Sequence, residues 1–505
     1  MPTSSLFEKI LKARVYDVAK ETPLEFANAL SRRFDNHIYF KREDLQPVFS
    51  FKLRGAFNKM FQLSDEEKRC GVIAASAGNH AQGIALAGTK LNVKTRIVMP
   101  EITPDIKIQA VKSFGGEPII YGASFDDAYA HAMKLVESEG YTFIHPFDDI
   151  DVIAGQGTIA MELLKQHQNP IDIVFLAIGG GGLAAGVATY IKHLYPDTLI
   201  IGVEHDQAPS MYESFRQNKR ITLDRIGTFA DGAAVKEVGQ NTFEITRNLV
   251  DDIILVSTDE TCAAIKDMFE DTRTMLEPAG ALAIAGLKKY VEVHNLKNKQ
   301  LITITSGANI NFDRLRHVAE RAELGEKREA LLAVTIPECP GSFRKFCNAI
   351  GNRPITEFNY RYADKNDAQV FAGVKLSNAT EERDELLQEL RDQDYAVTDL
   401  SDNELAKVHL RFMVGGHAQG LEDELLYRFR FPESPGALLH FLSSIGNTWN
   451  ISLFHYRNHG SDFGRVLVGI QVQKNKCEEF EQFLKNLGYD YWDETMNPAY
   501  QRFLG

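Results

Sequence analysis

Between residues 35 and 310, short apolar runs alternate with amphipathic segments long enough to form helices. Clear pairs of this kind are residues 71–76 and 77–91, 94–99 and 105–115, and 171–182 and 183–196. Such alternation is typical of parallel sheets covered by helices on both faces. The pattern therefore predicts an α/β domain that binds its ligands where strands end and helices begin.

The pattern changes at residues 313–329, which are highly charged and have no strong apolar face. Beyond them an internal repeat appears: the run 337–341 (PECPG) returns as 432–436 (PESPG), and 358–361 (FNYR) resembles 454–457 (FHYR). Each copy reads as a strand, a Pro-Gly turn, a helix and a second strand. We therefore expect an α/β domain over 1–312, a linker helix over 313–328, and two α+β units over 329–402 and 424–496.

Composition and charge exclude several classes of protein. The 505 residues carry 56 Lys and Arg against 69 Asp and Glu, a net charge of −13 that disfavours nucleic acid as a partner. The five cysteines form no ligand or disulfide pattern, so we expect no metal site and reduced thiols. No signal-peptide core opens the chain, and the most apolar stretch, 171–191, contains Asp172 and five glycines. We expect a cytoplasmic protein with no membrane contact.

Lys52 is the first candidate for chemistry. It lies in the run 50–56 (SFKLRGA), at the start of a helix-length segment. A lysine is usually a solvated surface group. Here Phe51 and Leu53 flank it, and apolar surroundings can lower the pKa of an amine and make it a nucleophile for Schiff-base chemistry.

A second candidate is the turn that follows the apolar run 72–75. Backbone N–H groups at the start of the next helix can bind a carboxylate, and the Asn79 amide can donate to or accept from a ring oxygen. An ordinary capped turn is an equally weighted alternative. The residues of this candidate carboxylate loop are Ser76, Ala77, Gly78, Asn79 and His80.

Two further turns complete the set. Gly179, Gly180, Gly181 and Gly182, followed by Leu183, can form a nest of N–H donors for a phosphate, although they match neither a dinucleotide fingerprint nor a P-loop. Ser306 follows the last apolar run, where a serine before glycine is most often only a turn residue. An amine, a phosphate nest, a carboxylate loop and a hydroxyl in one α/β domain suggest pyridoxal phosphate.

These motifs resemble the fold-type II pyridoxal-phosphate enzymes and, over nearly the whole chain, the biosynthetic threonine deaminases, which also carry two ACT-like regulatory units. The resemblance implies that Lys52 carries the cofactor and removes the substrate's α-proton, with Phe51 beside the ring. It also implies that the glycines and Leu183 hold the phosphate, that Asn79 meets the ring hydroxyl, and that Ser306 faces the pyridine nitrogen. A neutral hydroxyl there favours prompt loss of a β-substituent over a long-lived carbanion.

The reaction implied is conversion of L-threonine to 2-oxobutanoate and ammonia, the first step of isoleucine synthesis. The resemblance also implies that isoleucine inhibits the enzyme, that valine relieves this inhibition, and that the enzyme is a homotetramer. Aromatic alternation along strands usually marks a core, but the resemblance makes Tyr360, Tyr456 and Arg457 candidates for effector binding. An arginine beside an aromatic ring suits an amino acid.

Three details qualify this interpretation. Serine racemases, which are similar, have a serine where this chain has Ala77, so racemisation is disfavoured. Their divalent-ion site is matched by Glu204 and Ala208 but not by Ser210, which predicts no tight magnesium site. Glu277, before Pro278, is as consistent with a helix start as with a catalytic role.

Two alternatives remain at this point. One is a serine dehydratase or another β-elimination or β-replacement enzyme with the same cofactor. The other is a non-catalytic amino-acid sensor that has kept the fold.

Overall fold

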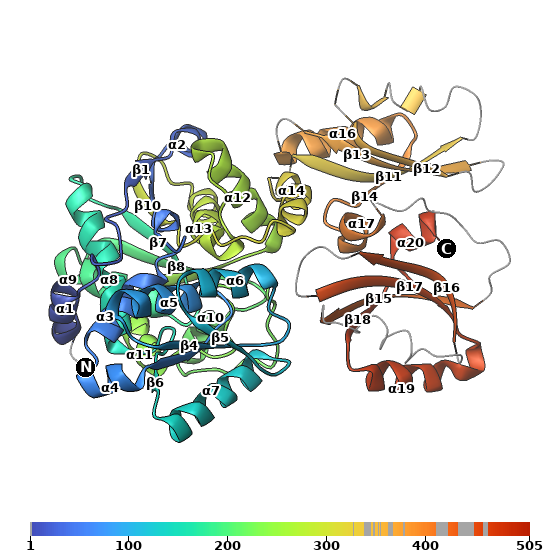
Figure 1. Cartoon of the computed structure of the whole chain (residues 1–505). Coiled ribbons are helices and arrows are strands. Elements are labelled where there is room, and N and C mark those ends of the chain that lie inside the picture. Colours follow the sequence, from blue (N-terminus) through green and yellow to red (C-terminus); the bar gives the residue numbers. More distant parts are fainter. Residues whose placement is uncertain are drawn as a thin grey trace. The chain divides into compact units, whose positions relative to one another are not determined.

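Two sheets, one parallel and one parallel except at its edge strand, lie in the first three-fifths of the chain in a computed structural model (Figure 1). The structure describes residues 3–326, 328–337, 345–346, 349–351, 353, 355–361, 367–376, 379–410, 423–432, 449–457 and 463–504. It divides into two units, Met1–Val318 and Ala319–Gly505. No helix in the described part of the chain is long and apolar enough to cross a membrane.

The larger sheet of the first unit has six strands. Their order is β1 (Leu24–Phe26), β2 (His37–Lys41), β10 (Gln300–Ile304), β7 (Ile173–Ala177), β8 (Leu199–His205) and β9 (Asp252–Val256). All neighbours are parallel except β1 and β2, which are antiparallel. The apolar runs predicted β7, β8 and β10 as strands. β1 lies before the predicted alternation, and neither it nor its reversed direction was expected.

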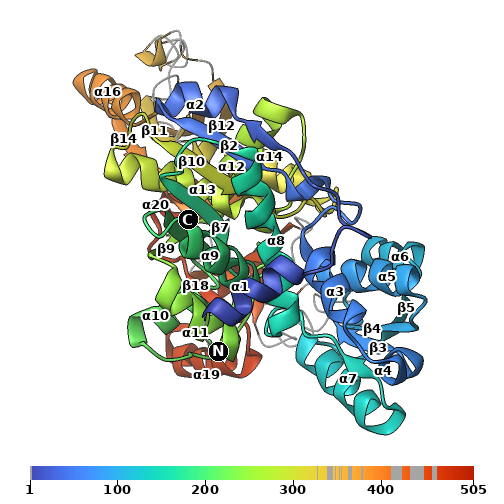
Figure 2. The same cartoon turned by 90° about the vertical axis from the view of Figure 1, so that its left-hand side faces the viewer.

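The smaller sheet has four parallel strands and lies to one side of the larger one (Figure 2). Their order is β5 (Glu117–Ile120), β4 (Thr95–Met99), β3 (Val72–Ala75) and β6 (Thr142–Phe143). The alternation of apolar and amphipathic segments predicts where strands occur, but not which sheet each strand joins. The division reflects pairing between strands far apart in the chain, such as β2 with β10.

Helices cover both faces of each sheet, as predicted. On β7, Val174 and Leu176 pack with α8 and α9, while Phe175 points the other way, toward Tyr290 of α13. The helices of this unit are α1 (Thr3–Lys12), α2 (Asn28–Phe34), α3 (Lys52–Phe61), α4 (Asp65–Cys70), α5 (Asn79–Leu91), α6 (Asp105–Ser113), α7 (Phe125–Glu139), α8 (Ile150–Gln166), α9 (Gly182–Leu194), α10 (Ser210–Gln217), α11 (Gln240–Leu249), α12 (Thr258–Thr272) and α13 (Pro278–His294), with a short 3₁₀ turn η1 (Glu43–Leu45).

The charged segment predicted as a linker contains α14 (Arg314–Gly325). The second unit then holds two four-stranded antiparallel sheets. The first is β12 (Ile355–Arg361), β13 (Asp367–Lys375), β11 (Glu329–Pro337) and β14 (Ala396–Asp399), with α16 (Ala379–Asp392) and α17 (Glu404–Val408). The second is β16 (Asn450–Arg457), β17 (Phe463–Gln471), β15 (Glu424–Pro432) and β18 (Asp490–Asp493), with η3 (Lys474–Lys476), α19 (Cys477–Leu487) and α20 (Pro498–Phe503).

The sequence repeat is visible strand by strand. The first strand of each sheet spans nine residues, and the strands bearing the FNYR and FHYR runs each contain one irregular position in their pairing, between Ile355 and Glu357 and between Ile451 and Leu453. A shared apolar cluster that includes Leu331 and Phe371 of the first sheet and Leu426 and Leu467 of the second joins the copies. The predicted Pro-Gly turns lie outside the described residues.

Candidate active site

A cavity opens at the carboxyl ends of β7 and β10, where the sequence predicted ligands to bind. Including its mouth, it encloses about 470 Å³. Four helices begin at or beside it: α3, α5, α9 and α13. It is lined by Phe51, Lys52, Asn79, Phe147, Ala177, Gly179, Gly180, Gly181, Gly182, Leu183, Gly232, Ala233, Glu277, Ala279 and Ser306. The predicted nucleophile, phosphate nest, amide and hydroxyl therefore surround one space.

Lys52 is the first residue of α3. Its Nζ donates a hydrogen bond to the Pro146 carbonyl oxygen at 2.8 Å and lies 5.5 Å from the centre of the Phe51 ring. Burial lowers the pKa of the Lys52 amine to about 8, against an opposing effect of the Glu277 carboxylate. The amine therefore loses its proton far more easily than an ordinary lysine and becomes a nucleophile near neutral pH.

The four glycines form the turn from β7 into α9. Gly181 has φ +94°, in the left-handed region that favours glycine, and Gly182 begins the helix. A Cβ on Gly180 would lie 2.2 Å from the Phe147 ring, so no larger residue fits there unless that ring moves. The Thr242 hydroxyl donates to the Gly180 carbonyl oxygen at 2.6 Å and anchors the turn. Free N–H groups at the start of a helix suit a phosphate.

The loop before α5 joins the end of β3 to the cavity. Asn79 reaches the cavity, while the Gly78 N–H turns back to the Ser76 hydroxyl at 3.3 Å. The His80 ring points elsewhere: its Nε2 donates to the Ile144 carbonyl oxygen at 2.9 Å, and burial lowers its pKa to about 3. His80 is thus a neutral ring, and only its backbone N–H is available to a carboxylate. Ala77 follows Ser76 in the same loop.

Ser306 follows β10 and faces the same space. Its hydroxyl donates to the Ala279 carbonyl oxygen at 3.3 Å, and its own carbonyl accepts from the Phe51 N–H at 3.3 Å. An isolated bridge pairs Ser50 with Gly307. These backbone bonds join the Ser306 turn to the segment that carries Lys52.

Glu277, for which the sequence favoured a helix start and a catalytic role equally, lines the cavity. Burial, and to a smaller extent repulsion from Asp231, raises the pKa of Glu277 to about 7. Other lining residues were not expected from the sequence. Gly232 and Ala233 were not predicted at all, although the small-residue run after Asp231 was visible in the sequence. Phe147 carried no sequence signal.

Asp231 lies at the centre of an ion-pair group beside the cavity. Its carboxylate accepts from Lys107 at 2.7 Å and from Arg314, the first residue of α14, at 3.2 Å. Although burial alone would raise it, these two cations lower the pKa of Asp231 to about 2. Asp231 therefore stays ionised and holds the loop that presents Gly232.

Glu204, the one acidic residue that matched a divalent-ion site, instead caps a helix. Its carboxylate accepts the backbone N–H groups of Met211 at 2.9 Å and Tyr212 at 2.7 Å. Burial raises its pKa to about 8 despite these bonds.

The regulatory candidates lie on corresponding strands. Tyr360 lies on β12 opposite Val370, and Tyr456 and Arg457 lie on β16 opposite Val466 and Arg465. Their side chains fall outside the described part of the structure. The backbone register thus places the two tyrosines at equivalent positions of the two copies.

The cavity fits pyridoxal phosphate by the chemistry of its donors. A desolvated amine suits the cofactor's aldehyde, and the glycine turn suits its phosphate. Asn79 and the uncharged Ser306 can meet the polar atoms of the ring. Gly232 and Gly307 pack closely against these groups: an added Cβ would lie 3.0 Å from Ala279 Cβ on Gly232 and 2.3 Å from Glu277 Oε1 on Gly307, so neither position accepts a larger residue without a shift.

Comparison with known proteins agrees with this assignment. Residues 15–307 match the family of pyridoxal-phosphate dependent enzymes, and residues 320–410 and 415–504 each match the C-terminal regulatory domain of threonine dehydratase. The chain is 54% identical to L-threonine dehydratase biosynthetic IlvA of Burkholderia multivorans over 100% of both chains. It is also 54% identical to its namesake from Escherichia coli K12, over 98% of this chain and 96% of the other.

Solved structures point the same way. The processed form of threonine deaminase isoform 2 from Solanum lycopersicum has a TM-score of 0.63 and 51% identity, covering 64% of this chain and 88% of that one. Serine racemase from Dictyostelium discoideum is more distant, at 33% identity and a TM-score of 0.57 over 61% of this chain and 99% of that one. By these matches over its catalytic and its paired regulatory regions, this chain belongs to the biosynthetic threonine dehydratases, a family of pyridoxal-phosphate dependent enzymes.

Proposed function

We propose that this chain is an L-threonine ammonia-lyase, which converts L-threonine to 2-oxobutanoate and ammonia. The observation that carries the proposal is the Lys52 amine, hydrogen-bonded to the Pro146 carbonyl oxygen in one cavity with a glycine nest for phosphate. The overall reaction balances without an oxidant or reductant: a water leaves threonine, and a water later enters as ammonia is released.

When bound, pyridoxal phosphate supplies an aldehyde for amines and an electron-withdrawing ring that acidifies the substrate's α-proton. We assign Lys52 as the residue that binds the cofactor covalently and Phe51 as its neighbour beside the ring. Asn79 and Ser306 would contact the polar atoms of the ring. The phosphate would be bound by Gly179, Gly180, Gly181, Gly182 and Leu183. We assign the substrate carboxylate to the backbone of residues 76–80.

Lys52 has the properties of a general base. A pKa of about 8 leaves a substantial fraction of the amine neutral at neutral pH, ready to accept the α-proton. Phe51 and Phe147 add apolar surface to the lining of the same space. Ser306 has no negative charge, so it does not hold a proton on the ring nitrogen, and early loss of the β-hydroxyl is favoured over a long-lived carbanion.

The test is release of 2-oxo acid by the purified holoprotein from L-threonine and, separately, from L-serine. Release from threonine, with serine the poorer substrate, is the expected result. Preferential use of serine would make the chain a serine dehydratase. Absence of release from either, in a protein that binds the cofactor, would contradict the proposal.

The same proposal includes feedback control by the second unit. Support comes from its two matches to the regulatory domain of threonine dehydratase. Isoleucine inhibits and valine relieves that inhibition, through Tyr360, Tyr456 and Arg457. The active form is a cytoplasmic homotetramer, which light scattering of the purified protein tests by its mass.

Tyr456→Ala tests the effector site. We expect the isoleucine concentration for half-inhibition to rise about tenfold while turnover without effector stays within twofold, because removing an aromatic contact weakens binding by one to two kcal/mol, roughly. Tyr491→Ala, a part-exposed tyrosine on β18 of the same sheet, is the matched control. An unchanged inhibition curve in Tyr456→Ala would remove that residue from the site.

A further inference from the structure

Asn79 has two hydrogen-bond partners inside the candidate site. Its Oδ1 accepts from Asn309 Nδ2 at 2.6 Å, and its Nδ2 donates to Glu277 Oε1 at 2.5 Å. Asn309 belongs to the turn after β10 and Glu277 precedes α13. The amide is thus held from both sides by residues from distant parts of the sequence.

The direction of these bonds follows from a backbone carbonyl. Asn309 Nδ2 also donates to the Val48 carbonyl oxygen at 2.8 Å, and a carbonyl can only accept. The nitrogen of Asn309 must therefore face both Val48 and Asn79. Asn79 must in turn present its oxygen to Asn309, which leaves its NH₂ group on the side of Glu277 and the cavity.

One hydrogen of that NH₂ group remains for a ligand. Glu277 takes one of the two hydrogens, and a carboxyl oxygen is a suitable acceptor for it. Asn79 lines the cavity, so the second hydrogen can face a ligand there. Asn79 therefore offers the cavity a donor, although an asparagine by itself could offer a donor or an acceptor.

The two supporting residues are themselves fixed to the Lys52 segment and to the Ser306 turn. The Ala308 N–H donates to the Phe49 carbonyl oxygen at 2.8 Å, next to the Val48 contact. The Glu277 N–H donates to the Gly307 carbonyl oxygen at 3.2 Å. Asn309 and Glu277 thus bond to the same short turn that carries Ser306.

We propose that Asn309 and Glu277 are positioning residues that hold the Asn79 amide with its N–H toward the ring oxygen of the cofactor. This inference rests on the proposed function only for the identity of the cofactor. A fixed donor stabilises an anionic oxygen, and charge-assisted hydrogen bonds of this kind are the stronger ones. The pair thus makes Asn79 selective for the ionised form of a ring hydroxyl.

Asn309→Asp tests the proposal with almost no change of shape. An aspartate cannot donate to Val48 or to Asn79, so the Asn79 amide turns and its oxygen replaces the N–H on the cavity side. We expect the dissociation constant of pyridoxal phosphate to rise about tenfold and the absorption band of the bound cofactor to move. The readouts are equilibrium titration of the cofactor and the absorption spectrum at one pH.

Asn311→Asp is the matched control, because it adds the same charge two residues later in the same turn. The Asn311 side chain has no hydrogen-bond partner in the described structure. Wild-type affinity and spectrum in Asn309→Asp, or equal losses in both variants, would overturn the proposal. If Asn309→Asp does not fold, the same titration on Asn309→Ala decides, with the same expected loss.

Glu277 is tested by a pair of variants. Glu277→Gln keeps an oxygen that can accept from Asn79, so cofactor affinity should stay within about threefold, whereas Glu277→Leu should lose about tenfold. Equal losses in both would show that charge, not the hydrogen bond, matters, and would remove Glu277 from the proposal. These readouts need no turnover, so a holoprotein without lyase activity would refute the proposed function and leave this inference standing.

Discussion

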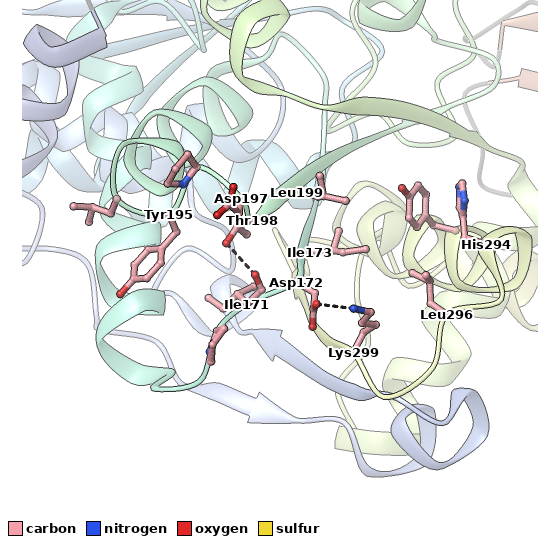
Figure 3. Close-up of a pocket in the computed structure, with 14 residues that line it drawn as sticks. Ile171, Asp172, Ile173, Tyr195, Asp197, Thr198, Leu199, His294, Leu296 and Lys299 are labelled. Atoms are coloured by element: carbon pink, nitrogen blue, oxygen red, sulfur yellow. Dashed lines mark hydrogen bonds and ion pairs between the residues drawn. The ribbon is translucent and has the colours of Figure 1, made fainter.

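Two cavities lie at opposite ends of the same strands and differ in size and chemistry. The candidate active site, of about 470 Å³, lies beyond the carboxyl ends of β7 and β10. A larger cavity, of about 1180 Å³ with its open mouth, lies at the amino ends of β7, β8 and β10. Figure 3 shows its lining, with Ile173 and Leu199 at the strand starts and Lys299 beside Asp172.

The larger cavity has little chemistry to offer. Lys299 donates to Asp172 at 3.0 Å, and the other oxygen of that carboxylate accepts from the Gln300 N–H at 2.8 Å, so this pair is satisfied internally. Helices end here: Leu194 is the last residue of α9 and His294 of α13. The smaller cavity receives the starts of those two helices, with free N–H groups and a positive dipole end.

The comparison shows that size does not mark the functional site in this fold. Chain direction does, because every strand of β2, β10, β7, β8 and β9 runs toward the same edge, and the turns that follow them meet there. The tetraglycine turn after β7 and the Ser306 turn after β10 are two such turns.

The largest effect should come from removing the Lys52 amine from the cavity at the carboxyl ends of the strands. Lys52→Ala should lower turnover of L-threonine by at least about a thousandfold, because it removes both the covalent anchor and the general base. The measurement is 2-oxo acid release by a variant shown to be folded by circular dichroism. Appreciable turnover in folded Lys52→Ala would show that the cavity at the carboxyl ends of the strands is not the active site.

A smaller effect should follow from distorting the phosphate nest. Gly181→Ala places a side chain at φ +94°, which costs about 1–2 kcal/mol and should weaken pyridoxal phosphate binding about tenfold. The new Cβ at position 181 would also lie 2.7 Å from Met211 Cε and 2.8 Å from Thr242 Cβ. Gly140→Ala is the control for backbone strain alone, because it also places a side chain at positive φ (+75°), at the end of α7 with no atom near the new Cβ. Equal cofactor affinity in the two variants would show that the glycine turn does not bind the phosphate.

The pH dependence of cofactor capture sharpens the role of Lys52. Only the neutral amine attacks the aldehyde, and burial lowers the pKa of Lys52 to about 8. The rate at which cofactor-free protein captures pyridoxal phosphate should fall about tenfold for each pH unit below 8 and level off above it. Stopped-flow absorbance from pH 6 to 10 measures this. A rate still rising steeply at pH 10 would contradict burial of the amine.

The smallest effect should come from the amino-end cavity. Lys299→Ala removes a part-exposed ion pair, which contributes at most about 1 kcal/mol to the free energy of unfolding. Turnover and cofactor affinity should stay within twofold, as measured by 2-oxo acid release and titration. A large loss of activity in this variant would mean that the two ends of the sheet are not functionally distinct.

Much of the fold could be predicted from the pattern of residues. The run 72–75 is β3, the segment after Asn79 is α5, and the repeat offset is matched by strands β11 and β15. These elements follow from the local periodicity of apolar residues, which can be read from each short segment of the sequence. The division into two sheets does not, because it depends on which distant strands pair.

The site divides in the same way. Lys52, the glycine turn, Asn79 and Ser306 were visible because unusual residue types stand at strand-to-helix turns. Asn309 and Phe147 gave no such signal, because their roles come from contacts outside their own local segments. Asn309 contacts Asn79, which lies 230 residues earlier in the chain, and Phe147 packs against the glycine turn at Gly180.

The sequence by itself determined the repertoire of groups: which side chains can act as nucleophile, phosphate nest and donor, and that two copies of one α+β unit follow. Only the tertiary structure decided their state. The lowered pKa of Lys52 and the raised pKa of Glu277 arise from burial. The direction of the Asn79 amide arises from the Val48 carbonyl acting through Asn309. Desolvation and hydrogen-bond direction depend on what surrounds a group in space, and local sequence does not contain that information.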